Sequence, residues 1–345
     1  MDRIVVGTTG GADAPQMKYR LGPLVREGSW PMDIIAAGTF PGRDDVEALL
    51  AAGGPGTVLV LQRVLPSSAE MRRLRAAYDS VVFDFDDAIY AAMPDIRASR
   101  FKLGAKRLLR LAARGSTSAS SRRRPLIKVL CEVDVCVVGN EILAEFARRY
   151  AKRVEEIPST VQPIAALPTG KPEPPVLVWT GVAGNRQYLE LLRGPLTRLA
   201  GEIDYKLRIV CSRNWDDAPV EVEFVRWSQQ AEHEALLSST VGLAPVTDDP
   251  FSRGKCQYRS LLFGGHGLPT VASPVGIMDR IVVHGETGFL ARSDDEWLEG
   301  LRSCLSQPAL AAQLGEKALE RVRASYSHQV GIERWTRLFK ELAGA

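Results

Sequence analysis

The sequence predicts an α/β protein made of two doubly wound, Rossmann-like domains. Short apolar runs ending in Gly, Ser, Asp or Asn alternate with longer segments of helical periodicity in both halves of the chain, as in parallel sheets with crossover helices. A proline-rich stretch separates the halves, and 345 residues are more than one hydrophobic core usually organises. We therefore expect two domains that face each other across a cleft.

The first half contains the elements of one such domain over residues 1–160. Strand-like apolar runs occur at residues 4–7, 34–38, 58–61, 81–84 and 135–139. Segments with helical character lie between and after them, at residues 44–52, 68–78 and 141–150. Ligands bind such sheets beyond the carboxyl ends of the strands, so the residues that follow each run are the informative ones.

Six prolines between residues 158 and 175 exclude regular helix or central strand there, and we place an interdomain linker at residues 161–175. A second domain is predicted over residues 176–325. Its strand-like runs are residues 176–179, 207–211, 220–225, 241–245 and 270–273, with helices at 187–199 and 232–237 among them. The chain is helical almost throughout after residue 290, and we expect residues 326–345 to form a helix that packs back on the first domain.

Charge is distributed unevenly along the chain. The net charge is only +3, yet residues 96–131 hold eleven Lys and Arg and no acid. This segment is either a solvated helical face or a surface for an anionic partner, and an acidic carrier protein and an anionic membrane surface both fit. It lacks interleaved aromatic residues, so we do not expect a nucleic-acid partner.

The cysteine pattern and the N-terminus favour a cytoplasmic protein. The five cysteines are scattered and form no C-x-x-C pair, which argues against a disulfide framework and a zinc site. No signal-like run and no membrane-length apolar stretch occur in the sequence. A serine-hydrolase elbow, a P-loop and a complete G-x-G-x-x-G are also absent, which lowers the expectation of hydrolases, phosphate-loop enzymes and nicotinamide dehydrogenases.

The most specific motif lies in the second half. Residues 248–259 read DDPFSRGKCQYR, residues 261–276 read LLFGGHGLPTVASPVG, and residues 285–290 read GETGFL. In combination they resemble the donor-binding segment of family-four glycosyltransferases, retaining enzymes of the two-domain GT-B fold. The resemblance implies transfer of a hexose from a nucleoside-diphosphate sugar with retention of anomeric configuration. It implies no metal and no other cofactor, because GT-B enzymes generally use basic side chains and helix dipoles in its place.

Lys255 and Arg259 are the leading catalytic and donor-binding candidates. They lie one helical turn apart and can present two cations to the departing diphosphate; the alternative is a pair of solvated helix charges. The glycine turn of residues 7–13, the turn after residue 180 and the strand end at Trp227 complete the predicted donor site, although Trp227 could equally pack between elements. The donor-binding residues are then Gly10, Gly11, Gly181, Gly184, Trp227, Ser228, Asp249, Phe251, Ser252, Lys255, Arg259, Val275 and Gly276.

Two carboxylates of the resembled family are missing from this chain. Gly254 and Leu262 stand where the family typically has two glutamates, the second of which usually holds the ribose hydroxyls. The departure leaves two alternatives open, a divergent mode of donor binding and a catalytically weakened protein that binds a nucleotide sugar or a partner.

The first half carries a second match, to a subset of the same transferases. Residues 84–88 read DFDDA and residues 139–141 read GNE, and Arg20 resembles that subset's early acceptor-side arginine. The acceptor-binding residues are then Arg20, Arg63, Asp86 and Asn140.

Asp86 and Asp87 are the catalytic candidates of this half, orienting the acceptor or the transferred sugar at the cleft. A role as caps of the following helix remains open. Residues 84–86 also spell D-x-D, a metal motif of another glycosyltransferase fold, but they lie in the acceptor half, far in sequence from the basic donor loop.

The acceptor is the least determined part of the prediction. The Arg- and Ala-rich composition is typical of high-GC bacteria that make antibiotics and similar metabolites. We therefore expect a natural-product intermediate, free or bound to a carrier protein, or a polysaccharide or lipid-linked glycan reached from the inner surface of the membrane.

Overall fold

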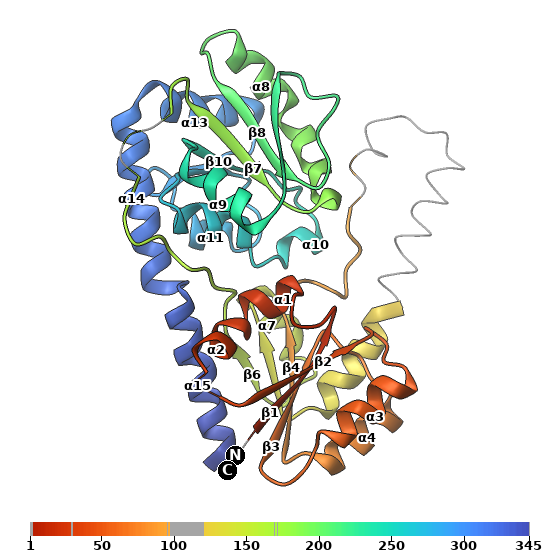
Figure 1. The fold of residues 1–345 in the computed structure, drawn as a ribbon. Helices are drawn as coiled ribbons and strands as arrows, with labels where there is room; N and C mark the ends of the chain where they lie inside the picture. The colour runs from red at the N-terminus through yellow and green to blue at the C-terminus, as the bar shows by residue number, and fades with distance from the viewer. Residues whose placement is uncertain are drawn as a thin grey trace, which may run out of the picture.

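The computed structural model describes residues 3–28, 30–94, 96, 121–168, 170 and 172–344. The chain forms two α/β lobes, one above the other, with a pair of long helices along one side of both (Figure 1). The two doubly wound domains expected from the sequence are confirmed.

The first lobe is built on a six-stranded parallel sheet of order β2-β1-β3-β4-β5-β6. Its central strands are buried on both faces, which explains their continuous apolar runs: Leu59 packs into one face's core and Val60 into the other's. The strands are β1 (Arg3–Thr9), β2 (Met32–Ala37), β3 (Thr57–Gln62), β4 (Ser80–Phe85), β5 (Val135–Val138) and β6 (Val154–Glu156). The helices are α1 (Pro15–Tyr19), α2 (Gly22–Glu27), α3 (Arg43–Ala51), α4 (Ser68–Ala77) and α7 (Glu141–Ala147), and residues 121–132 are also helical.

The second lobe has a six-stranded parallel sheet of order β12-β11-β10-β7-β8-β9. Its strands are β7 (Val176–Thr180), β8 (Lys206–Cys211), β9 (Val222–Arg226), β10 (Val241–Ala244), β11 (Thr270–Ala272) and β12 (Gly288–Leu290). Its helices are η1 (Ala183–Leu192), α8 (Arg193–Ala200), α9 (Gln229–Leu237), α10 (Pro250–Arg253), α11 (Tyr258–Gly265), α12 (Met278–Ile281), α13 (Asp294–Ser306) and α14 (Pro308–Ser325).

The chain then crosses back to the first lobe. Helix α15 (His328–Gly344) runs down beside α2, and both chain ends lie at the foot of that lobe (Figure 1). Its apolar face, including Trp335 and Phe339, joins the core that contains Ile4 and Val6 of β1. The backbone of Val161 also forms a parallel bridge with Ser327, where the two interlobe crossings meet.

Local sequence signals explain where several helices begin. Ser67 accepts a hydrogen bond from the Glu70 amide while the Glu70 carboxylate accepts one from the Ser67 amide, and Ser293 and Glu296 repeat this capping box at α13. Four short elements could not be predicted from the sequence, namely β6, β12, α1 and α2. Each of them is too short to show a periodicity.

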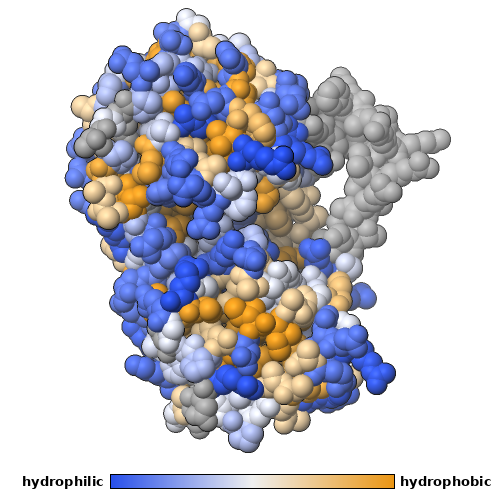
Figure 2. Space-filling model, viewed as in Figure 1, coloured by the Kyte–Doolittle hydropathy of each residue, from blue (hydrophilic) through white to orange (hydrophobic). Residues whose placement is uncertain are grey.

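The basic segment of residues 96–131 falls largely outside the described residues, since only residue 96 and residues 121–131 belong to them. In the part of the chain that is described, no helix has the length and apolar character needed to cross a membrane. Hydrophilic residues cover much of the viewed face of the second lobe, and hydrophobic residues gather near the middle of the first (Figure 2).

Candidate active site

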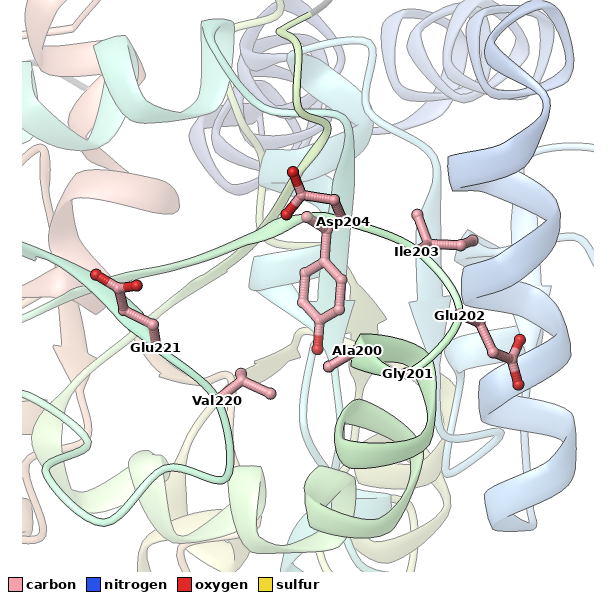
Figure 3. A pocket seen from close by; sticks show the side chains of 8 residues that line it. Ala200, Gly201, Glu202, Ile203, Asp204, Val220 and Glu221 are labelled. Atoms are coloured by element: carbon pink, nitrogen blue, oxygen red, sulfur yellow. The ribbon is translucent and has the colours of Figure 1, made fainter.

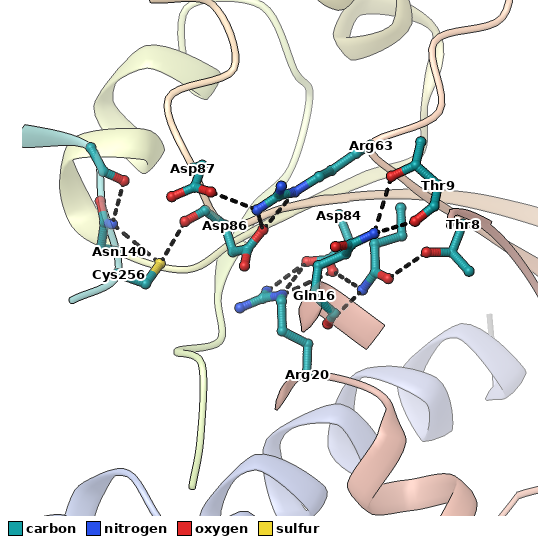
Figure 4. Close-up of polar contacts among 12 residues, drawn as sticks. Thr8, Thr9, Gln16, Arg20, Arg63, Asp84, Asp86, Asp87, Asn140 and Cys256 are labelled. Atoms are coloured by element: carbon teal, nitrogen blue, oxygen red, sulfur yellow. Dashed lines mark hydrogen bonds and ion pairs between the residues drawn. The ribbon is translucent and has the colours of Figure 1, made fainter. Parts of the chain in front are cut away.

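The lobes contact each other where the loop before α11 meets the ends of β4 and β5. The Asn140 side-chain amide donates to the Gly254 carbonyl at 3.1 Å and to the Cys256 sulfur at 3.4 Å. The Cys256 thiol in turn donates to the Asp86 carbonyl at 2.9 Å (Figure 4). The predicted donor loop and the predicted acceptor residues are therefore brought together.

This contact depends on two glycines. A Cβ atom at position 254 would lie 2.6 Å from the Ala88 Cβ, and one at position 139 would lie 2.1 Å from the Cys256 sulfur. Real Cβ atoms do not approach so closely. Gly254, which stands where the resembled family has a glutamate, thus occupies a place that the opposite lobe fills.

Lys255 lies half-buried at the cleft. Its Nζ donates to the Asn185 side-chain oxygen at 3.2 Å and lies 4.9 Å and 5.1 Å from the ring centroids of Tyr188 and Phe251. Burial lowers the pKa of Lys255 to about 8, although the nearby Asp87 carboxylate acts in the opposite direction. The protonated amine is therefore held mainly by ring faces and an amide.

Arg259 is positioned by the end of β7. Its Nε donates to the Thr180 carbonyl at 2.5 Å and its guanidinium lies 4.7 Å from the Trp179 ring centroid. Gly181 leaves room for it, because a Cβ there would come within 2.8 Å of an Arg259 nitrogen. Burial lowers the pKa of Arg259 to about 10.

Among the residues that the structure describes, no carboxylate lies within ion-pair distance of Lys255 or Arg259. Two desolvated cations on one wall of a cleft attract an anion, and a diphosphate carries the charge that would fit both. This wall is the clearest candidate for a binding site.

The opposite wall carries the acidic pair predicted from the sequence. The Arg63 guanidinium binds both carboxylates: its Nε donates to Asp86 at 2.8 Å and its Nη2 donates to Asp87 at 2.8 Å (Figure 4). Burial acts to lower the pKa of Arg63, but the two aspartates outweigh it and raise that pKa. Arg63 holds this arrangement from a left-handed backbone conformation with φ of 58°, uncommon for a residue other than glycine.

Asp87 is the more exposed member, with 34% of its side chain accessible against 13% for Asp86. Burial raises the pKa of Asp87, while Arg63 and then Lys255 pull it down. The charge of Asp87 is therefore balanced mainly by Arg63 of its own lobe and to a lesser extent by Lys255 of the other lobe.

Arg20 and Asp84 lie beneath this pair and have no exposed side-chain surface. The Arg20 Nε donates to both Asp84 oxygens at 2.9 Å, and its Nη1 donates to the Ile157 carbonyl at 2.7 Å. Arg20, predicted to contact the acceptor, has no surface in this structure through which to do so. Asp84, the first aspartate of the D-x-D sequence, is likewise buried and makes its contacts with Arg20 and Gln62.

Asn140 begins α7 and contacts the second lobe, as described above. Its side-chain oxygen caps the helix by accepting from the Leu143 amide at 3.0 Å. Its neighbour Glu141 forms an ion pair with Arg280 of the second lobe. The GNE sequence therefore supplies the N-cap of α7 and, through Asn140 and Glu141, contacts to the second lobe.

The other donor-loop residues hold the loop in shape. Asp249 caps α10 by accepting from the amides of Phe251 at 2.9 Å and Ser252 at 3.0 Å, and the Ser252 hydroxyl lies 3.1 Å from the Tyr188 hydroxyl. Val275 accepts from the Gln257 side-chain amide at 3.2 Å.

The predicted glycines lie at turns near both sheet edges. Gly276 has a left-handed backbone and packs against α10 so closely that a Cβ would lie 2.3 Å from the Arg253 carbonyl. Gly10 and Gly11 also have left-handed backbones, with φ of 85° and 72°, in the turn after β1. Gly184 lies within η1, after the Gly181 turn.

Trp227 follows β9 and 44% of it is exposed. Ser228 next to it caps α9 by accepting from the Ala231 amide at 3.1 Å. Trp227 is thus available at the carboxyl edge of the sheet and is not packed between elements.

A cavity of the second lobe lies away from this cleft. It has a volume of about 420 Å³ and is lined by residues 200–205 and 220–221 (Figure 3). These residues precede β8 and β9, so the cavity lies at the amino edge of the second sheet and no predicted site residue lines it. Nor do the described residues contain a cluster of three His, Cys, Asp or Glu side chains that could hold a metal ion.

Sequence reasoning missed several residues of the cleft. Tyr19 of the first lobe stacks on Tyr258 of the second with ring centroids 3.7 Å apart, and Asn185 and Tyr188 support Lys255. Glu232 lies beside Arg259 and Thr180. Tyr258 lies inside the motif of residues 248–259, but nothing in that motif sets it apart, and the placement of Asn185 directly after the glycine turn is the other available signal.

Comparison with known proteins agrees with this geometry. A model of the family described as glycosyl transferase-like matches residues 186–337, which include Lys255 and Arg259. Residues 186–337 therefore form a glycosyltransferase-family domain, and the chain as a whole has the GT-B fold. Trehalose synthase from Pyrococcus horikoshii is 35% identical to this chain over 78 residues, which cover 23% of this chain and only 19% of the length of that enzyme.

Solved structures support the same fold over the whole chain. Sucrose-phosphate synthase from Thermosynechococcus elongatus superposes with a TM-score of 0.69, 15% identity and coverage of 99% of both chains. HepE from Anabaena, solved with UDP and glucose, gives a TM-score of 0.62 at 12% identity, covering 99% of this chain and 100% of that one. At these identities the likeness establishes the GT-B fold of this chain and nothing finer.

Proposed function

We propose that this protein transfers a hexose from a nucleoside-diphosphate sugar to an acceptor hydroxyl in the cleft between the lobes. The observation that carries the proposal is the pair of desolvated cations, Lys255 and Arg259, at the carboxyl edge of the second sheet. Neither forms an ion pair with a carboxylate in the described part of the chain. The similar fold of HepE, which was solved in complex with UDP and glucose, supports a donor of this class.

In the proposed reaction the anomeric configuration is retained. The acceptor oxygen bonds to the anomeric carbon as the bond from that carbon to the diphosphate oxygen breaks. The diphosphate keeps the bonding electrons and takes the hydroxyl proton on the same face. Lys255 and Arg259 stabilise the charge that develops on the leaving group, and Asp86 and Asp87 orient the acceptor or the sugar from the facing wall. No metal is part of this proposal.

The acceptor belongs to the proposal only as a class. A natural-product intermediate, free or carrier-bound, fits an antibiotic pathway of a high-GC bacterium, and a polysaccharide or lipid-linked glycan is the other class. The basic segment of residues 96–131 would draw an acidic carrier or an anionic membrane surface to a cytoplasmic enzyme.

A second candidate function is binding of a nucleotide sugar or a partner without efficient transfer. The observation that favours it is the contact between Gly254 and Ala88, which fills the place of a carboxylate that the family resemblance implies. Hydrolysis or transfer of a bound donor would exclude this candidate.

The test is calorimetric and thermal-shift titration with UDP, GDP, ADP and dTDP. We expect one nucleotide to bind the wild type and to lose its binding in the Lys255→Ala, Arg259→Ala double variant. Arg253→Ala is the matched control, because Arg253 is an exposed cation of the same loop that pairs with Asp248. Absence of binding by all four nucleotides, or equal binding by the double variant, would overturn the proposal.

A further inference from the structure

Glu232 lies on the first turn of α9 and reaches the end of β7. Its Oε1 accepts a hydrogen bond from the Thr180 hydroxyl, while the Thr180 carbonyl accepts one from Arg259. Glu232 and Arg259 therefore flank the same residue. A group bound by the Arg259 guanidinium has the Glu232 carboxyl as its neighbour.

The Glu232 charge acts on Tyr19 of the first lobe, the residue that stacks on Tyr258 of the second lobe. Burial and next the Glu232 charge raise the pKa of Tyr19, which lies on α1 of that lobe. Burial also raises the pKa of Glu232 itself, and hydrogen bonds from Thr180 and Trp227 act in the opposite direction. The carboxyl thus lies close to both lobes and is already partly desolvated.

Trp227 lies between β9 and α9, the helix that carries Glu232. After burial, which raises the pKa of Glu232, the nearby Trp227 indole acts to lower that pKa, and 44% of Trp227 remains exposed. The wall therefore presents a cation, a carboxyl and an exposed indole close to one another. The diphosphate, ribose and base of a nucleoside diphosphate each match one of these groups.

At position 262, where the resembled family has a glutamate on this helix, α11 carries the apolar side chain of Leu262. Leu262 packs with Val225 into the apolar cluster that contains Leu236 of α9. Glu232 is one turn before Leu236 on the same helix. The carboxyl group of this wall is thus supplied by α9 and not by α11.

We propose that Glu232 binds the ribose hydroxyls of the donor nucleotide, with Trp227 covering the base. A carboxylate has about four acceptor sites on two oxygens, so two hydroxyls can be added to the partners it already has. The inference rests on the proposed function, since it places the nucleoside next to a diphosphate held by Arg259.

The experiment compares Glu232→Gln with wild type in calorimetric titrations. The probes are the best-binding nucleotide of UDP, GDP and ADP, its 2′,3′-dideoxy counterpart, and inorganic pyrophosphate. Glu234→Gln is the matched control, because Glu234 is an exposed glutamate of the same helix whose partner is Gln230.

We expect the wild type to bind the dideoxy nucleotide about tenfold more weakly than the ribonucleotide, as the loss of charge-assisted hydrogen bonds predicts. In Glu232→Gln the two nucleotides should bind alike, at the weaker level, while pyrophosphate binding is unchanged. Glu234→Gln should match the wild type. If Glu232 had only a structural role, Glu232→Gln would weaken the binding of both nucleotides and of pyrophosphate.

A second variant tests the base contact independently. Trp227→Ala should weaken nucleotide binding about tenfold but leave pyrophosphate binding unchanged, because only the nucleotide has a base that can stack on the indole. Its control is Phe224→Ala, because Phe224 is an exposed aromatic within β9, the strand that ends just before Trp227.

The outcomes separate this inference from the proposed function. If the wild type binds a ribonucleotide tightly and Glu232→Gln keeps the full preference for ribose, the subsite is wrong and the donor site remains. If no nucleotide binds the wild type, the donor site is wrong and the subsite falls with it.

Discussion

Lys255 combines a lowered pKa with a place opposite Asp87. Its pKa of about 8 lies below the ordinary value because burial disfavours the charged amine. A bound diphosphate would reverse that effect, since it supplies the opposite charge. Binding of the nucleotide and protonation of Lys255 should therefore be linked.

This linkage predicts a pH dependence of nucleotide affinity. The free amine loses its proton as the pH rises through about 8, so affinity should fall about tenfold between about pH 7 and about pH 9.5, where the nucleotide's own phosphates no longer titrate. Calorimetry at several pH values measures it. Lys255→Met should bind weakly with a nearly flat profile; a slope equal to that of the wild type would show that another group titrates.

The buried Arg20–Asp84 pair makes a prediction about stability. Asp84→Asn leaves a fully buried guanidinium without its countercharge, so the free energy of unfolding should fall by about 3–5 kcal/mol. Urea titration measures the loss. Asp13→Asn is the control: Asp13 is almost fully exposed beside Lys18, and its replacement should change stability by less than about 1 kcal/mol.

At the scale of elements, the strands could be predicted because burial on both faces leaves continuous apolar runs. All six residues of β3 are buried, and the sequence there shows it plainly. The three residues of strand β6 are only partly buried or exposed, so the sequence there shows no continuous apolar run. The loop between α10 and α11 was predicted as a donor loop, but the tight contact of Gly254 with the other lobe depends on packing between distant segments.

That contact predicts the effect of restoring the missing glutamate. Gly254→Glu should separate the lobes or strain the loop, because its Cβ would meet Ala88, and the protein should lose about 1–3 kcal/mol of stability. Denaturant titration reads the stability, and small-angle X-ray scattering reads any lobe separation. Gly54→Ala is the control, since a Cβ there meets nothing within 4 Å. An unchanged Gly254→Glu protein with improved nucleotide binding would contradict the packing argument.

At the scale of the molecule, α15 ties the end of the second lobe to the core of the first. Trp335 is fully buried and lies against Phe339 and the Arg20 guanidinium. Trp335→Ala should therefore lower the free energy of unfolding by about 3–5 kcal/mol. Calorimetric unfolding measures the loss, and Phe40→Ala, which removes an aromatic ring that is 52% exposed, should lie within about 0.5 kcal/mol of the wild type.

The candidate site could be predicted only in part, for a physical reason. Lys255, Arg259 and the acidic pair occur in short motifs, and the structure brings these motifs together across the cleft. Arg20 belongs to a motif as well, but burial cannot be seen from its neighbours in sequence. Glu232 was missed because a glutamate on a polar helix resembles any solvated one until the fold places it beside Thr180.

Cys256 places a free thiol at the contact between the lobes. All five cysteines are free thiols, but Cys256 is buried between the lobes with its hydrogen donated to the Asp86 carbonyl, and burial raises its pKa. Since thiolates are the reactive form, alkylation at this position should wait for the lobes to part. In a Cys131→Ser background, which removes the exposed thiol, the alkylation rate of Cys256 would count how often the cleft opens, and a bound nucleotide that bridges the cleft would slow it.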